Sequence, residues 1–278
     1  MLEQVIDIKI WKRWVLSLNN QNHYTYIDNK TVPIVFIHGV GLNRNMWLPQ
    51  INYFKNQSLL TYDLLGHGRT TFEKEEVKME DYVDQLLSLS ELLNIDKFHL
   101  VGFSIGSLIA INFAANFQKK LKSLTLIATT YKRSEKQRQE VIDRVNLAKL
   151  NKPISQLALK RWFTDEYIQN NPNVYEEFMK ILTKDGEDQK NFIKAYELFA
   201  YYKDDINIIK KIKTKTLVMT GSIDPGSTPE MSKKLSNDLI NSSFIEINNG
   251  KHLCSIECSD DVNINIKKFI ENVWIKKI

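Results

Sequence analysis

The chain has 278 residues, of which 43% are hydrophobic and 26% are charged, as in an average soluble globular protein. A chain of this length and composition can bury a large core without disulfides or structural metals, and it can still form one α/β core. The formal net charge is +5, but basic residues recur along the whole chain close to acidic ones, which argues against a nucleic-acid partner.

The cysteines and the N-terminal residues exclude further classes of protein. Cys254 and Cys258 are too few for a disulfide framework, and with His252 they lack the fourth ligand and the spacing of a zinc site. We therefore predict two reduced thiols and no bound metal. Neither a signal peptide nor an apolar run long enough to span a bilayer is recognisable, which predicts a cytoplasmic protein without a membrane partner.

Apolar runs mark the predicted strands. Residues 3–27 alternate short apolar and polar runs, which predicts two or three antiparallel strands. Later runs are uniformly apolar, as is typical of strands buried on both faces of a parallel sheet. These runs cover residues 34–37, 59–62, 98–101, 124–128, 216–219 and 244–247. Between them, helical periodicity is clearest over residues 80–93 and 106–117.

The alternation of strands and helices breaks between residues 131 and 212. This segment predicts amphipathic helices over about 134–150, 154–162, 173–184 and 188–202. Repeated strand–helix units predict an α/β fold whose mostly parallel central sheet is flanked by helices. We predict a core domain of residues 1–130 and 213–278, and an inserted helical cap of residues 131–212 over the ligand-binding carboxyl edge of the sheet.

The segment Gly102-Phe103-Ser104-Ile105-Gly106 contains the pattern G-x-S-x-G. An apolar strand precedes it and a helical pattern follows it, which is the context of a nucleophilic serine on a tight strand-to-helix turn. The two glycines let the strand and the helix approach each other closely. The short pattern alone also occurs by chance, but in this context it predicts Ser104 as a nucleophile.

A serine hydroxyl needs a base, and the base needs a carboxylate that orients it. In proteins with this elbow, the acid and then the histidine follow the serine along the chain. His252 is the only histidine after Ser104, and it comes just past a predicted strand. Asp224 lies just beyond the strand at 216–219, whereas the preceding strand ends without a carboxylate. We therefore predict Asp224 and His252 as the acid and the base.

The oxyanion that forms during such a reaction needs two backbone N–H donors. One is expected from Ile105, directly after the nucleophile. The other is expected from the loop His38-Gly39-Val40-Gly41, with Val40 as the donor.

Three other histidines have a structural interpretation. His38 and His67 lie in glycine-containing turns and are expected to brace loops rather than to transfer protons. His99 falls inside a predicted strand and is expected to be a satisfied core or edge histidine.

From about residue 30 to its end, the chain resembles α/β-hydrolases through five motifs in order. They are residues 38–41, residues 63–69, the serine elbow, the Asp224 turn and the His252 loop. Within that superfamily the chain looks most like the 3-oxoadipate enol-lactonases and related esterases. The residues that carry this likeness are Arg161-Trp162-Phe163-Thr164, 224–229 and 250–257. One departure is Ser107, where the family usually has a second glycine.

The resemblance implies a serine hydrolase that cleaves a small carboxylic ester or lactone through an acyl-enzyme and needs no cofactor. It implies that Trp162 faces the active site from the cap. Arg161 and Arg133 are candidates to hold a substrate carboxylate. Phe103 and Leu253, which neighbour the nucleophile and the base in the sequence, are further candidates for substrate contacts.

Alternatives remain at this point. The same triad also supports a C–C bond hydrolase or a perhydrolase, and some proteins of this fold bind ligands without catalysis. A haloalkane dehalogenase is disfavoured, because that chemistry puts aspartate where Ser104 stands. The sequence leaves the oligomeric state open, a homo-oligomer included.

Overall fold

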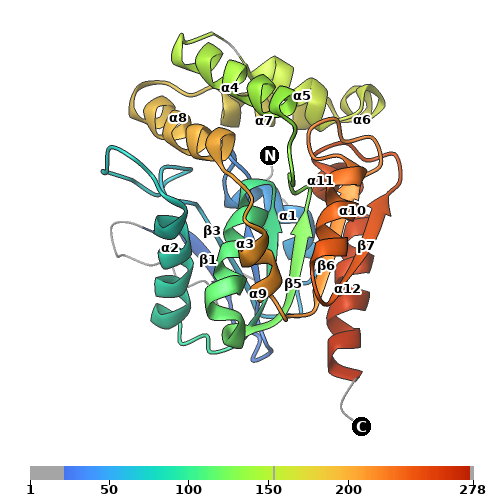
Figure 1. The fold of residues 1–278 in the computed structure, drawn as a ribbon. Coiled ribbons are helices and arrows are strands. Elements are labelled where there is room, and N and C mark those ends of the chain that lie inside the picture. The colour runs from blue at the N-terminus through green and yellow to red at the C-terminus, as the bar shows by residue number, and fades with distance from the viewer. Residues whose placement is uncertain (1–21, 153, 276–278) are drawn as a thin grey trace.

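The computed structural model of the protein describes residues 22–152 and 154–275. Its centre is a seven-stranded sheet in the order β1-β3-β2-β4-β5-β6-β7 (Figure 1). The strands are β1 (Tyr24–Ile27), β2 (Ile34–Ile37), β3 (Leu59–Tyr62), β4 (Phe98–Phe103), β5 (Leu121–Ile127), β6 (Thr216–Gly221) and β7 (Ser242–Ile247). β1 runs antiparallel to β3 and every other neighbouring pair is parallel, which confirms the predicted mostly parallel sheet.

The predicted strands are confirmed, with differences at their ends. β4 and β6 run two residues beyond their predicted ends, because the ladder with the neighbouring strand continues through their glycines. His99 of β4 is buried and bonds to the Ser123 hydroxyl of β5 at 2.7 Å, as expected of a satisfied histidine. Of the antiparallel strands predicted over residues 3–27, β1 is present, and residues 3–21 lie outside the described part of the chain.

Helices cover both faces of the sheet. Val35 and Ile37 of β2 pack in one core with α2 (Met79–Leu92), α3 (Ile105–Phe117), α9 (Ile206–Lys211) and α10 (Pro229–Asp238). Ile34 and Phe36 point the other way and share a second core with α1 (Leu48–Tyr53) and α12 (Ser259–Ile275). Within residues 22–152 and 154–275, no helix combines the length and the apolarity that crossing a bilayer would require.

Six helices lie between β5 and β6 in the described chain, and the first five of them lie above the carboxyl ends of the strands (Figure 1). These five are α4 (Glu135–Lys149), α5 (Ser155–Trp162), α6 (Asp165–Asn170), α7 (Pro172–Leu182) and α8 (Gly186–Tyr201). α6 and α9 were not predicted from the sequence, because six residues are too few to show a helical period. The domain boundaries at 131 and 212 stay a prediction, and α9 near the second boundary packs against α3 of the core.

β4 and α3 meet at a turn that leaves no room for a side chain at two positions. A Cβ atom at Gly102 would lie 2.3 Å from the carbonyl oxygen of Gly106. A Cβ atom at Gly106 would lie 2.4 Å from the carbonyl oxygen of Ile37. Glycine is therefore required at both positions, as the sequence predicted.

Two histidines brace the loops that follow β2 and β3. The His38 ring donates from Nδ1 to the Gly39 carbonyl (2.8 Å) and accepts the Leu64 N–H at Nε2 (2.9 Å). The His67 ring contacts the Leu65 carbonyl through Nδ1 at 3.1 Å. Burial lowers the pKa of both histidines to about 3, so both rings are neutral at pH 7.

We expect Gly106→Ala to destabilise the protein by about 3 kcal/mol or more, because its methyl group would collide with backbone that cannot move aside. Gly226→Ala is the matched control, since a Cβ atom there has its nearest neighbour at 3.6 Å. Urea unfolding of both variants measures the difference. Equal stabilities would contradict the close approach of β4 and α3.

We expect stability to fall as the pH is lowered from about 6.5 towards 3, since the unfolded chain then protonates histidines that stay neutral when folded. Each such ring contributes up to about 1.4 kcal/mol per pH unit in this window. The free energy of unfolding of His67→Gln should therefore depend less steeply on pH than that of the wild type. Parallel curves for the two proteins would contradict a buried neutral His67.

Candidate active site

A cavity of about 200 Å³ lies between the helices above the sheet and the carboxyl ends of the strands. The core contributes the turn after β2, the elbow after β4 and the loops after β6 and β7. The upper helices contribute aromatic and arginine side chains. The lining includes Val40, Phe103, Ser104, Thr130, Arg133, Arg144, Arg161, Trp162, Phe192, Tyr196, Phe199, Asp224 and His252.

Ser104 stands at the turn between β4 and α3. Its backbone has φ 56° and ψ −118°, a conformation that is strained for a residue with a side chain. The ladder supports it, because the Ser104 N–H donates to the Ile127 carbonyl at 2.9 Å. This geometry holds the hydroxyl at the floor of the cavity, where only 4% of the residue is exposed.

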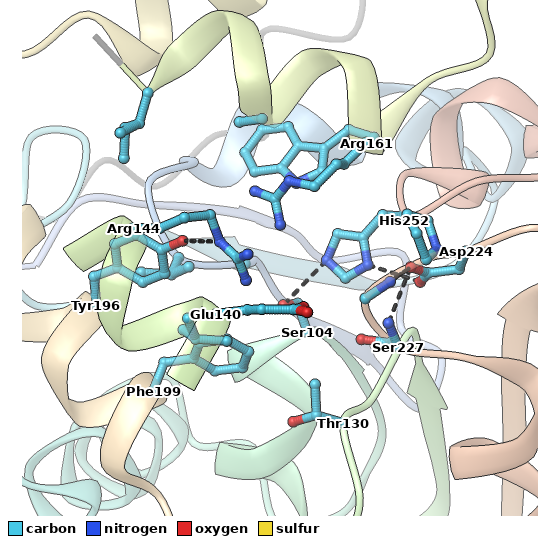
Figure 2. A pocket seen from close by; sticks show the side chains of 18 of the residues that line it. Ser104, Thr130, Glu140, Arg144, Arg161, Tyr196, Phe199, Asp224, Ser227 and His252 are labelled. Carbon is cyan, nitrogen blue, oxygen red and sulfur yellow. Dashed lines mark hydrogen bonds and ion pairs between the residues drawn. The ribbon is translucent and has the colours of Figure 1, made fainter. Parts of the chain in front are cut away.

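The three residues predicted to form a triad are joined in series by hydrogen bonds, from Asp224 to His252 and from His252 to Ser104 (Figure 2). The distance from His252 Nε2 to Ser104 Oγ is 3.3 Å, and that from His252 Nδ1 to Asp224 Oδ2 is 2.8 Å. This arrangement fits an imidazole that donates from Nδ1 to the carboxylate and accepts the serine proton at Nε2. Their coming together depends on the parallel sheet, whose strands all end at the same edge.

The Asp224 carboxylate is buried and held from both sides. Its second oxygen, Oδ1, accepts the N–H groups of Gly226 (2.8 Å) and Ser227 (3.0 Å). These bonds replace the water that a buried anion loses. They also leave Oδ2 facing the His252 ring, so the loop after β6 determines which oxygen serves the imidazole.

Of the residues predicted to contact substrate, Phe103 and Trp162 line the cavity beside the imidazole and Leu253 does not. Ring centroids of Phe103 and Trp162 lie 5.0 Å and 6.4 Å from that of His252, and both residues line the cavity. Leu253 is fully buried and does not line the cavity, so its predicted contact with substrate is not supported. Its backbone N–H instead donates to the Trp162 carbonyl at 3.0 Å, which ties the histidine loop to the end of α5.

The segment predicted to supply an oxyanion donor is a tight turn of residues 39–42. The Leu42 N–H donates to the Gly39 carbonyl (3.2 Å), and Gly41 has φ 78°, as the third residue of a type II turn requires. Val40 is the second residue, so the turn does not use its N–H. A trans peptide points that N–H away from the Gly39 carbonyl, and Val40 lines the cavity.

Ile105 is the first residue of α3, and the first N–H groups of a helix have no partner within the helix. Ser107, where the resemblance noted above leads one to expect glycine, follows in the first turn. Its hydroxyl donates to the Gly102 carbonyl (2.6 Å) and accepts the Ile127 N–H (3.1 Å). The departure from the family pattern therefore adds bonds to the elbow without crowding it.

Two arginines from the upper helices face the cavity above Ser104 (Figure 2). Arg144 of α4 donates from Nε to the Tyr196 hydroxyl at 3.1 Å, and Arg161 of α5 donates to its own helix at Leu157. Burial and then the nearby Arg144 charge lower the pKa of Arg161. Within the described residues, neither guanidinium has a carboxylate at salt-bridge distance.

Arg133, the other arginine predicted to hold a carboxylate, also lines the cavity, and its Nη1 is buried without a partner among the described residues. Its Nη2 donates to the carbonyls of Phe199 (2.8 Å) and Tyr202 (3.0 Å), and its guanidinium lies over the Phe199 ring. It therefore joins the start of α4 to the end of α8. The sequence analysis missed Arg144, although that residue falls on the same helical face as the buried Val141 and Val145.

The two cysteines are unpaired. Burial raises the pKa of the Cys258 thiol to about 11 and that of Cys254 well above its usual value. Across residues 22–152 and 154–275, no group of three or more His, Cys, Asp or Glu side chains could hold a metal ion.

Comparisons with known proteins identify the fold. The family model of the alpha/beta hydrolase fold matches residues 32–257. The (E)-2-((N-methylformamido)methylene)succinate hydrolase of Acinetobacter baylyi is 30% identical and covers 94% of this chain and 98% of its own. The 3-oxoadipate enol-lactonase 2 of the same organism is 24% identical over 85% of this chain and 87% of its own.

Among solved structures, the enol-lactonase from Burkholderia xenovorans LB400 matches with a TM-score of 0.83 and 23% sequence identity. It covers 90% of this chain and 96% of that one. At this sequence identity the match supports only the fold. Together with the family model and the sheet order, it leads to one conclusion. The chain belongs to the α/β-hydrolase fold family.

Proposed function

We propose that the protein is a serine hydrolase that cleaves a small carboxylic ester or lactone in two acyl-transfer steps. The observation that carries this proposal is the series of contacts from Asp224 through His252 to Ser104, at 2.8 Å and 3.3 Å. Ser104 Oγ attacks the carbonyl carbon while His252 Nε2 takes its proton. Asp224 keeps the imidazole in the required tautomer and stabilises its charged form.

The remaining steps use groups at the same edge of the sheet. The N–H groups of Val40 and Ile105 stabilise the oxyanion of each tetrahedral intermediate. His252 then gives its proton to the leaving alkoxide, and water, with His252 again as base, releases the acyl group from Ser104. This scheme balances without a metal or an organic cofactor.

We further propose that the substrate carries a carboxylate held by Arg144 and Arg161. Both guanidinium groups face one cavity and neither forms a salt bridge among the described residues, although the exposed Glu140 also lines that cavity; two such like charges favour an anionic ligand. The names of the succinate hydrolase and the 3-oxoadipate enol-lactonase also contain carboxylic acids. Arg144 joins Arg161 in this role, and Arg133 stays a further candidate, because its Nη2 bonds to Phe199 and Tyr202 while its Nη1 is buried without a partner among the described residues.

A second substrate class has an observation of its own. The relative that is 30% identical over 94% of this chain is named for an N-methylformamido-substituted methylenesuccinate. The same triad and arginine pair suit a small unsaturated dicarboxylate that carries an amide. C–C bond hydrolysis and perhydrolysis are outcomes that the same substrate panel would reveal, and a non-catalytic ligand-binding protein would turn over none of these substrates.

We expect a fluorophosphonate probe to label the native protein and not Ser104→Ala, because the probe reacts only with an activated serine. Ser88→Ala, which changes an exposed serine of α2, is the matched control and should be labelled like the wild type. Labelling is read by intact-protein mass spectrometry. Equal labelling of wild type and Ser104→Ala would reject Ser104 as the nucleophile.

We expect Arg144→Gln and Arg161→Gln to lower kcat/KM for a carboxylate-bearing aryl ester by about tenfold to a hundredfold, the effect of a lost charge-assisted hydrogen bond. The matched neutral ester should be hydrolysed nearly as fast as by the wild type. Lys160→Gln, an exposed neighbour on α5, is the control. If both esters lost activity equally, or neither did, the carboxylate site would be wrong.

A further inference from the structure

We propose that Asp63 and Arg44 are positioning residues that hold the oxyanion turn, residues 39–42, against the nucleophile. This inference rests on the proposed function, because it concerns the hole that would receive the oxyanion. Both residues lie outside the cavity lining, and their proposed role is to position a turn that lines it. Neither residue contacts the imidazole or the serine hydroxyl in the bonds described above.

The oxyanion turn lies directly on the elbow. A Cβ atom at Gly39 would lie 2.8 Å from the Phe103 ring and 3.4 Å from Ser104 Cβ. Small shifts of this turn therefore change the distance between the Val40 N–H and the carbonyl that Ser104 attacks. Oxyanion donors act because they are already in place when charge develops, so their support matters for the rate.

The turn is attached at both ends to two consecutive residues of the loop after β3. At its start, the His38 ring accepts the Leu64 N–H (2.9 Å) and donates to the Gly39 carbonyl (2.8 Å). At its end, the Arg44 N–H donates to Asp63 Oδ1 (2.8 Å), and Arg44 Nη1 donates to Asp63 Oδ2 (2.6 Å). Asp63 and Leu64 thus form one support for the whole turn.

The Asp63 carboxylate is itself held in place by its surroundings. The carboxylate is fully buried, and Oδ2 also accepts the Arg69 N–H at 3.1 Å. A Cβ atom at Gly68 would lie 2.3 Å from that oxygen, so the loop wraps closely around it. A buried carboxylate that loses a charged partner must find another, and this one can do so only if its surroundings move. The Arg44 side chain is 17% exposed, so its removal is the gentler change.

The opposite face of the turn contacts the upper helices. A Cβ atom at Gly41 would lie 3.0 Å from the Phe192 ring and 3.4 Å from Leu182. Only apolar side chains are close to Gly41 on this side, so they limit how far the turn can move upward but do not orient its peptides. Among the described residues, the hydrogen bonds that reach the turn from the outside come from Asp63 and Leu64, so we assign the positioning to this side.

The test compares Arg44→Gln, Arg44→Lys and Asp63→Asn with the wild type on a neutral aryl ester. We expect Arg44→Gln to lower kcat by about tenfold to a hundredfold with little change in KM, as expected when an oxyanion donor is misplaced. Binding of phenylboronic acid, which forms a tetrahedral anion on the serine, should weaken by a similar factor. Arg44→Lys should recover part of both losses, because lysine keeps the charge.

Lys74→Gln is the matched control, since it removes an ion pair with Asp81 on the protein surface. It should leave kcat and boronate binding unchanged. Hydrogen exchange of the peptide that covers residues 38–44 gives a readout that is independent of turnover, and it should be faster in Arg44→Gln. If Asp63→Asn does not fold, the two Arg44 variants decide the question.

Wild-type kcat, boronate affinity and exchange in Arg44→Gln would overturn the proposal, even if its Tm were lower. A rise in KM at unchanged kcat would also overturn it. A wild type that shows no Ser104-dependent turnover or labelling would instead reject the proposed function. Hydrogen exchange of residues 38–44 would then still show whether the Asp63–Arg44 pair holds the turn.

Discussion

The site depends on the sharp turn by which the chain leaves β4 and enters α3. Ser104 occupies a backbone conformation that residues with side chains avoid, and such strain persists only where the surroundings enforce it. Here the strand ladder, the Ser107 hydroxyl and the absence of side chains at Gly102 and Gly106 enforce it. The result is a hydroxyl that faces the cavity beside the first N–H groups of a helix.

Some charged side chains around the cavity have hydrogen-bond or salt-bridge partners and others have no carboxylate partner. This difference separates structural residues from candidates for binding a ligand. Asp224 is buried but accepts two backbone N–H groups besides its contact with His252. Asp63 is equally buried and is matched by Arg44. Arg144 and Arg161 have no such carboxylate among the described residues, so their positive charge is available to a ligand.

Local patterns predicted most of this arrangement, and their failures have physical causes. The loss of strand pattern after β5 marked the helices that cover the site, but α6 was too short to be recognised. Leu253 neighbours His252 in sequence yet turns into the core, because adjacent side chains on a tight loop point in different directions. Arg133 and Arg144 belong to the same sequence segment, and only packing against α8 reveals that both line the cavity, the first bonded through Nη2 to the Phe199 carbonyl and the second to the Tyr196 hydroxyl.

The sequence by itself determined the parallel sheet, the elbow and the identity of the three triad candidates. These follow from the periodicity of apolar residues, from glycine at a crowded turn and from the order of residues along the chain. Only the tertiary structure decided which residues surround Ser104 from a distance: Arg144 in the cavity, and Arg44 with Asp63 behind the turn of residues 39–42. Such contacts join separate elements, and no local pattern carries the geometry with which those elements pack.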